Sequence, residues 1–190
     1  INPHNLNPNI ENMKYRINDK TLGIIISSIG GVGVDFSSLL NFKIPIIEDI
    51  CQSLGTRIKK KLSGLSGDYA IMSFGSTKII TGGIGGAVLF NDHNDYKVIE
   101  KIAAYESLPS IHLRDGFQKS YNMALPDISA GLILAQFKKL NKFISNRRDI
   151  AKKYDEVLSE KKNINIIQES EGHFFNRYRY YLLSADNTAI

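Results

Sequence analysis

Short apolar runs alternate with helical patterns along the first half of the chain. Four apolar runs rich in strand-forming residues each predict a short strand: residues 22–28, 43–49, 69–74 and 87–90. Residues 9–18 and 95–106 are predicted to be helical, and Asp35 is expected to cap a helix that continues to Leu40. Because each run is apolar throughout, we expect an α/β sheet covered on both faces.

The longest helical pattern extends from Asp127 to about Ser159. Its apolar residues recur every three or four positions, and basic residues fall largely between them, which predicts one long amphipathic helix. Two more strands are predicted after it, at residues 164–167 and 178–183. We therefore expect residues 1–158 to form one domain and residues 159–190 to begin a second, smaller one.

Composition limits the class of protein. The 190 residues are 43% hydrophobic and 23% charged, as in a globular domain, and no apolar run approaches the roughly 20 residues of a membrane span. The net charge of +5 suits any anionic partner, including a sugar nucleotide, without singling out nucleic acid. The single cysteine, Cys51, excludes a disulfide framework and a zinc cluster, so we expect no metal site.

The start of the chain has neither the basic head nor the apolar stretch of a signal peptide, so a cytoplasmic location is expected. The first residue, Ile1, is not a methionine. We therefore expect the chain to be an excerpt of a longer product.

Two acidic residues end one of the predicted strands. In open α/β sheets ligands bind beyond the carboxyl ends of strands, which makes Glu48 and Asp49 candidates for a site. Helix capping or a surface ion pair would explain the same two residues.

A turn rich in hydroxyl groups follows the next predicted strand. Ser73, Gly75 and Lys78 belong to a segment that could hold a phosphate through N–H groups, O–H groups and an ammonium group. Lys78 could instead be a covalent nucleophile that forms a Schiff base, or an ordinary solvated lysine. The segment lacks the spacing of a P-loop.

Two weaker signals follow along the chain. Four glycines within residues 82–86 permit close approach to a ligand, or simply a hairpin or bulge. Asn122, just before the long helix, could donate to an anion or belong to a turn.

In this order, the motifs resemble the DegT/StrS family of pyridoxal-phosphate (PLP) sugar aminotransferases. The resemblance rests on Ile46 to Gly55, Gly67 to Phe74, Lys78, Gly85-Gly86 and Tyr121-Asn122, and on residues 127–158. It implies fold type I, the aspartate aminotransferase-like fold, in which helices flank a mixed, mostly parallel sheet. It covers most of the chain, as a partial large domain and the start of a small C-terminal domain.

The resemblance also implies roles for five residues. Lys78 would bind the cofactor covalently and then move protons, while Asp49 would pair with the pyridine nitrogen. Gln52 would lie near the cofactor's ring hydroxyl and Ser73 would bind its phosphate. Asn122 would reach the phosphate site of a neighbouring subunit, so that a homodimer shares its active sites. The expected reaction moves an amino group from an amino acid, typically glutamate, to a nucleotide-linked keto sugar in the synthesis of amino sugars and surface polysaccharides.

The chain also departs from the family pattern, because Ser28, Ile84 and Ala124 replace a histidine, an acidic residue and an arginine. A non-catalytic homologue that keeps the fold for binding or assembly is therefore the alternative. A related dehydratase branch has histidine in place of the lysine, and Lys78 argues against it. A nucleic-acid binder using the basic residues of 138–153 is a third hypothesis, but a solvated helix face explains those charges better.

Overall fold

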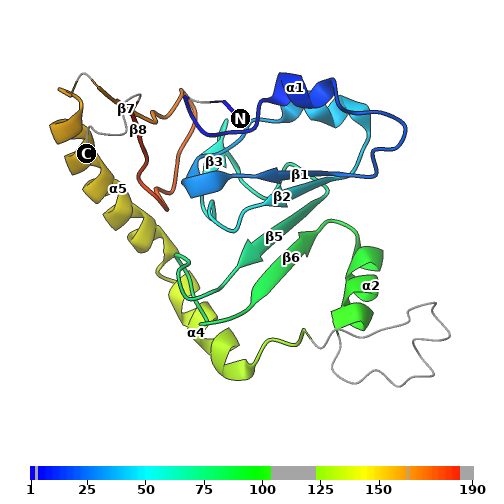
Figure 1. Ribbon diagram of the computed structural model, residues 1–190. Helices are drawn as coiled ribbons and strands as arrows, with labels where there is room; N and C mark the ends of the chain where they lie inside the picture. The colour runs from blue at the N-terminus through cyan, green and yellow to red at the C-terminus, as the bar shows by residue number, and fades with distance from the viewer. Residues whose placement is uncertain (3, 104–122, 162, 185–190) are drawn as a thin grey trace.

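A four-stranded sheet forms the centre of the chain in the computed structural model, which describes residues 1–2, 4–103, 123–161 and 163–184 (Figure 1). Its strands lie in the order β1 (Ile24–Ser27), β2 (Ile46–Asp49), β5 (Tyr69–Ser73) and β6 (Gly86–Phe90). The first three are parallel, and β6 runs antiparallel to β5. The four strands predicted in this half of the chain, and the mixed, mostly parallel sheet, are confirmed.

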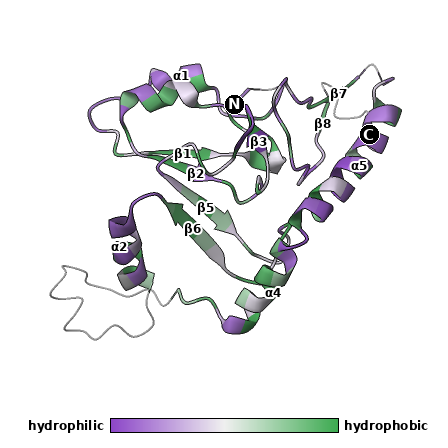
Figure 2. Ribbon diagram, turned by 180° about the vertical axis from the view of Figure 1, so that it is seen from behind, coloured by the Kyte–Doolittle hydropathy of each residue, from purple (hydrophilic) through white to green (hydrophobic). Residues whose placement is uncertain are grey.

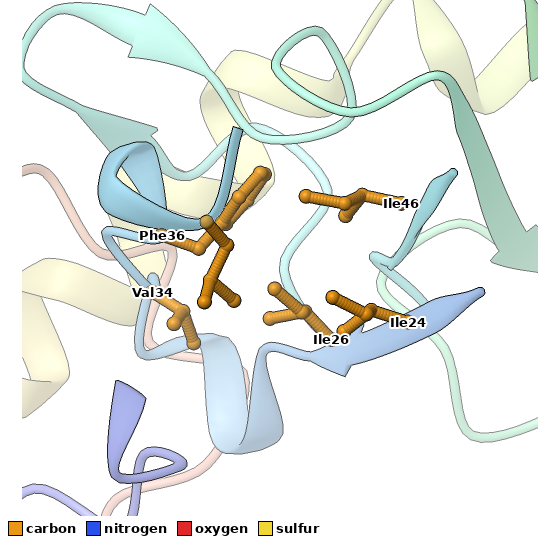
Figure 3. Packing of buried hydrophobic residues seen from close by; sticks show 6 residues of the cluster. Ile24, Ile26, Val34, Phe36 and Ile46 are labelled. Carbon is orange, nitrogen blue, oxygen red and sulfur yellow. The ribbon is translucent and has the colours of Figure 1, made fainter. Parts of the chain in front are cut away.

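One face of the sheet carries the largest cluster of buried side chains. It joins β1 and β2 to the segment between them: Ile24, Ile26, Val34, Phe36, Leu39 and Ile46 (Figure 3). The short helices α1 (Ile10–Lys14) and η2 (Ser37–Phe42) cover this cluster. The predicted helix after Asp35 is therefore a 3-10 helix, and Asp35 Oδ1 accepts from the Ser37 N–H at 3.1 Å. Each large apolar side chain buried here stabilises the fold by about 1.5–3 kcal/mol.

The opposite face of the sheet is more open, and the expectation that both faces are covered is wrong for the described residues. Side chains alternate along a strand, so Ile25 faces away from the cluster formed by its neighbours. Ile25 is 65% exposed, and Val88, on the same face by register, is 40% exposed. An apolar run in the sequence is therefore not enough to show that both faces of the strand are buried.

A two-stranded hairpin, β3 (Arg57–Ile58) and β4 (Lys61–Leu62), was not predicted from the sequence. Its two turn residues, Lys59 and Lys60, both have positive φ values, of 49° and 69°. A turn of this kind normally uses Asn-Gly or Gly-Gly, so two lysines gave no signal.

In the described residues, three longer helices follow the sheet: α2 (His93–Ala103), α4 (Asp127–Phe137) and α5 (Leu140–Leu158). The prediction of one helix over residues 127–159 is wrong, because Lys138 and Lys139 form a turn between α4 and α5. Figures 1 and 2 show α2 and the α4–α5 pair at opposite ends of β6. Figure 2 also shows that α5 is mainly hydrophilic, as predicted for its basic face.

The last part of the chain packs against α5 and the hairpin. β7 (Ile164–Ile166) and β8 (Leu182–Ser184) pair in an antiparallel manner, and β8 begins later than the predicted strand over residues 178–183. Arg57 and Phe174 exchange two backbone hydrogen bonds, of 2.8 and 2.9 Å. Arg148 of α5 forms an ion pair with Glu169. The boundary after residue 158 stays a prediction.

Candidate functional site

Three of the predicted site residues, Asp49, Ser73 and Lys78, lie at the carboxyl edge of the sheet. Asp49 is the last residue of β2 and Ser73 the last of β5, and parallel neighbouring strands end at the same edge. Lys78 follows β5 in a turn closed by its N–H, which donates to Gly75 O at 3.0 Å. Chain topology therefore brings together residues that stand 29 positions apart in the sequence.

Asp49 is held as a carboxylate. Its Oδ2 accepts from Ser27 Oγ at 2.9 Å, and its Oδ1 accepts from the Cys51 N–H at 3.0 Å. Burial raises the pKa of Asp49, but the hydrogen bonds from Cys51 and Ser27 and the positive charge of Lys78 outweigh it, so the pKa is lowered overall. Asp49 is thus ionised at neutral pH and lies within electrostatic reach of Lys78.

Lys78 faces a small cavity that it shares with two other predicted residues, Gln52 and Ser73, and with the thiol-bearing Cys51. Burial and the neighbouring Asp49 raise the pKa of the Cys51 thiol to about 11, while the charge of Lys78 opposes that shift. An amine, a thiol and a hydroxyl group therefore line this cavity, and the Asp49 carboxylate lies within electrostatic reach of the amine.

Two of the predicted cofactor-binding residues make contacts within the chain. Gln52 Oε1 accepts from the Gly30 N–H at 2.8 Å, in the turn that follows β1. Ser73 Oγ accepts from the Gly75 N–H at 3.3 Å, which orients it toward the lysine turn. Their roles toward a cofactor stay predictions.

The glycine-rich segment folds back onto the lysine turn. Phe74 N–H donates to Gly85 O at 2.8 Å, and Phe74 O accepts from Gly82 N–H at 2.9 Å. Helix α4 holds the same segment, since Gln136 Nε2 donates to Thr81 O at 2.7 Å and Gln136 Oε1 accepts from the Thr81 N–H at 3.2 Å. Of the two interpretations left open, these contacts favour a structural loop that supports Lys78.

Sequence reasoning missed two residues, one that contacts Lys78 and one that binds the loop carrying Gln52. The ring of Tyr178 lies beneath the lysine, with Lys78 Nζ 5.6 Å from the ring centroid. Asn176, which is fully buried, donates from Nδ2 to Gln52 O at 3.0 Å and to Leu54 O at 2.9 Å. Both lie about 100 residues after Lys78 in the sequence, and no spacing rule could have found them.

Other predicted features lie outside this group. Asn122 and Tyr121 are outside the described residues. Glu48 points to the opposite face from Asp49, where its carboxylate accepts three backbone N–H groups. Glu48 binds the backbone of a loop and is buried, so it is neither the helix cap nor the surface ion pair that the alternative interpretation expected. Among the described residues no group of side chains is suited to hold a metal ion.

Comparison with known proteins assigns this arrangement to a family. The profile of the DegT/DnrJ/EryC1/StrS aminotransferase family matches residues 1–189. The chain belongs to that family. The predicted resemblance is thus confirmed.

Relatives and solved structures agree on the fold of this DegT/DnrJ/EryC1/StrS chain. GDP-perosamine synthase of Vibrio cholerae is 28% identical over 190 residues, which cover 97% of this chain and 50% of that protein. The sugar aminotransferase CalS13 of Micromonospora echinospora superposes with a TM-score of 0.85 at 20% identity, over 100% of this chain and 55% of that one. E. coli GDP-4-keto-6-deoxy-D-mannose-3-dehydratase with bound hydrated PLP superposes with a TM-score of 0.84 at 21% identity. The match covers 100% of this chain and 54% of that one.

These comparisons confirm the predicted fold type I, with its mixed sheet and flanking helices. The chain spans about half the length of the relatives that it matches. No helix among the described residues is long and apolar enough to cross a membrane.

Proposed function

We propose that the protein is a PLP-dependent aminotransferase that moves an amino group from an amino acid to a nucleotide-linked keto sugar. The observation that carries the proposal is the pair of Asp49 and Lys78. The ionised carboxylate lies within electrostatic reach of a primary amine, and that amine lines a cavity together with the hydroxyl of Ser73.

The chemistry of these donors fits the cofactor. When bound, PLP withdraws electrons from the substrate carbon that loses a proton. Asp49 would keep the ring nitrogen protonated, because its own pKa is lowered and it stays negative at neutral pH. Ser73 would donate to the phosphate. Lys78 would hold the cofactor covalently through Nζ, with loss of the aldehyde oxygen as water, and its amine, when free, would carry the proton between substrate atoms.

The wider activity is carried over from the family. Glutamate is the proposed amino donor, and the product would be an amino sugar for surface polysaccharide. We further propose that two copies form a homodimer in which Asn122 of each copy reaches the other's phosphate site, with Gln52 near the ring hydroxyl. The protein would work in the cytoplasm, where no membrane or nucleic-acid partner is needed.

Two other functions fit the same fold. A sugar dehydratase is among the matched structures, and Lys78 argues against that chemistry because the dehydratase branch has histidine there. A non-catalytic homologue would have no need of an amine at a cavity with an ionised carboxylate within electrostatic reach. Asp49 and Lys78 therefore favour the aminotransferase over both.

The test is the visible absorbance of the purified protein mixed with PLP. Wild type is expected to show a new band above 400 nm, roughly the range of protonated imines of this cofactor, and borohydride reduction should leave the cofactor on a peptide containing Lys78. Lys78→Ala should abolish the adduct, whereas Lys153→Ala, on the exposed face of α5, should keep it. An adduct that survives Lys78→Ala would show that another residue is the nucleophile.

A second variant tests the carboxylate. Asp49→Asn should still bind PLP, but its half-reaction with glutamate should slow by at least about a hundredfold, because a neutral amide cannot stabilise the protonated ring nitrogen. An unchanged rate of this half-reaction would show that Asp49 only accepts the hydrogen bond from the Cys51 N–H and has no role in the reaction.

A further inference from the structure

The ring of Tyr178 is packed beneath the amine of Lys78. Lys78 Nζ lies 5.6 Å from the ring centroid, within the range of cation–π attraction. Tyr178 is only 7% exposed and belongs to a buried cluster with Phe74, Ile79, Ile80 and Ile133. The ring is therefore a fixed surface, and the four-carbon stem of the lysine is the part that can move.

Hydrogen bonds at both ends of Tyr178 fix that surface relative to the lysine turn. The Tyr178 N–H donates to Asn176 Oδ1 at 2.9 Å, and its carbonyl accepts from Arg147 Nη1 at 3.4 Å. At the other end of the side chain, Tyr178 Oη lies 3.2 Å from Thr77 O and 3.4 Å from Thr77 Oγ1. Thr77 directly precedes Lys78, so the ring is anchored to the turn that carries the amine.

Two cations, Lys78 and Arg179, lie near the ring. No ion pair with Lys78 is formed by the residues that the structure describes. A second cation, Arg179, has its Cζ 5.5 Å from the same ring centroid. The hydrogen bond with Thr77 and the charges of Lys78 and Arg179 together lower the pKa of Tyr178, against the effect of burial.

We propose that Tyr178 is a positioning residue for Lys78, holding its amine over the ring at the cavity shared with Cys51, Gln52 and Ser73. The role rests on the proposed function, in which the amine must meet the aldehyde carbon of the cofactor. Without the ring, the lysine stem would be free to sample several rotamers, and fewer of them would point at that cavity.

The test uses cofactor-free protein and competitive acetylation with acetic anhydride, read by mass spectrometry. The rate at Lys78 is divided by the rate at the exposed Lys153 in the same sample. Tyr178→Leu should raise this ratio about fivefold, the factor that corresponds to the loss of a cation–π contact of about 1 kcal/mol. Tyr178→Phe keeps the ring and should leave the ratio within about twofold of wild type.

Two further variants separate the ring contact from general loosening. Tyr178→Met fills the apolar space without a ring and should reproduce the result of Tyr178→Leu. Arg179→Gln removes the other cation and should leave the ratio unchanged. Equal ratios for wild type and both non-aromatic variants, at a temperature where circular dichroism shows all of them folded, would overturn the proposal. A fivefold rise of the acetylation ratio in Tyr178→Phe would also overturn it.

A second measurement follows the rate at which borohydride traps PLP on Lys78. Acetic anhydride can meet the amine in any orientation, whereas the aldehyde of bound PLP is held at one place, so a poorly oriented amine should be trapped more slowly. Tyr178→Leu should therefore be slowed about fivefold and Tyr178→Phe should match wild type. If wild type traps no PLP, the proposed function fails, while the acetylation ratios still decide whether the ring holds the amine. Normal trapping in Tyr178→Leu would leave the function standing and reject the positioning role.

Discussion

Replacing Glu48 by Gln tests whether the two acids at the end of β2 have different roles, with Glu48 holding a loop and Asp49 serving the cofactor. Glu48 is 5% exposed. Its Oε1 accepts from the Ser66 and Gly67 N–H groups at 2.6 and 2.7 Å, and its Oε2 accepts from the Gly64 N–H at 2.8 Å. All three donors belong to the loop that leads into β5, so one carboxylate satisfies three backbone groups of a loop with no helix or sheet partner for them.

Glutamine can accept at only one of the two positions. Its amide nitrogen would meet the Gly64 N–H donor to donor, and the remaining bonds would lose the strengthening that a charged acceptor gives. Losing one charge-assisted bond and leaving a buried N–H without a partner costs about 2–4 kcal/mol. The control Glu11→Gln removes an exposed ion pair with Lys14, of 2.7 Å, and should cost less than about 1 kcal/mol.

The assay is urea unfolding of the purified protein, followed by circular dichroism, with the slope against urea compared between variants. Glu48→Gln should lower the free energy of unfolding while the folded protein still binds PLP, because Glu48 faces away from the cavity of Lys78. A loss of less than about 1 kcal/mol would refute the argument that this carboxylate holds the loop. Loss of PLP binding in the folded variant would refute the claim that Glu48 has no part in the cofactor site.

Two further predictions concern close packing and the thiol. Gly31→Ala should destabilise the protein by more than about 3 kcal/mol, because a Cβ there would lie 1.9 Å from Asn176 Oδ1, in a residue whose φ is already +88°. Gly83→Ala has a similar φ of +80° but no neighbour within 4 Å, so urea unfolding should show a loss of only about 1 kcal/mol, and equal losses would contradict the clash. At pH 8, iodoacetamide should alkylate Cys51 about a hundredfold more slowly than an unperturbed cysteine thiol, since burial and Asp49 raise the pKa of Cys51 to about 11. Asp49→Asn should speed that alkylation, and a rate unaffected by this change would contradict the assigned cause.

Local patterns predicted the parts of the fold that depend on local chemistry. The strands around Ile24, Ile46 and Ala70 were predictable because each is a short apolar run between turn-forming residues. The same patterns could not tell whether a second layer covers Ile25. That depends on which other segments pack there, and an isolated strand carries no information about them.

The break between α4 and α5 shows the limit of helical periodicity. Lys138 and Lys139 are good helix formers, with no proline or glycine to mark an end. Tertiary contacts decide instead, since Gln136 at the end of α4 binds the backbone of Thr81. After this turn, α5 runs toward β7 and β8 (Figure 1).

The part of the candidate site that could be predicted consists of residues at or just after the ends of the predicted strands. Asp49 and Ser73 were found because both end apolar strands, and Lys78 because it follows one of them. Tyr178 and Asn176 could not be found in this way, because they come from a segment that joins the site only through folding. Their local sequence resembles any aromatic, basic stretch.

The amide of Asn176 ties the end of the chain to the loop beyond Asp49. Because one NH₂ group serves the carbonyls of both Gln52 and Leu54, the loop and the distant segment cannot shift independently without stranding a buried acceptor. A ligand that displaces this loop would therefore also displace a segment some 120 residues further along, and a change in that segment would reach the cavity through Asn176 as well as through Tyr178.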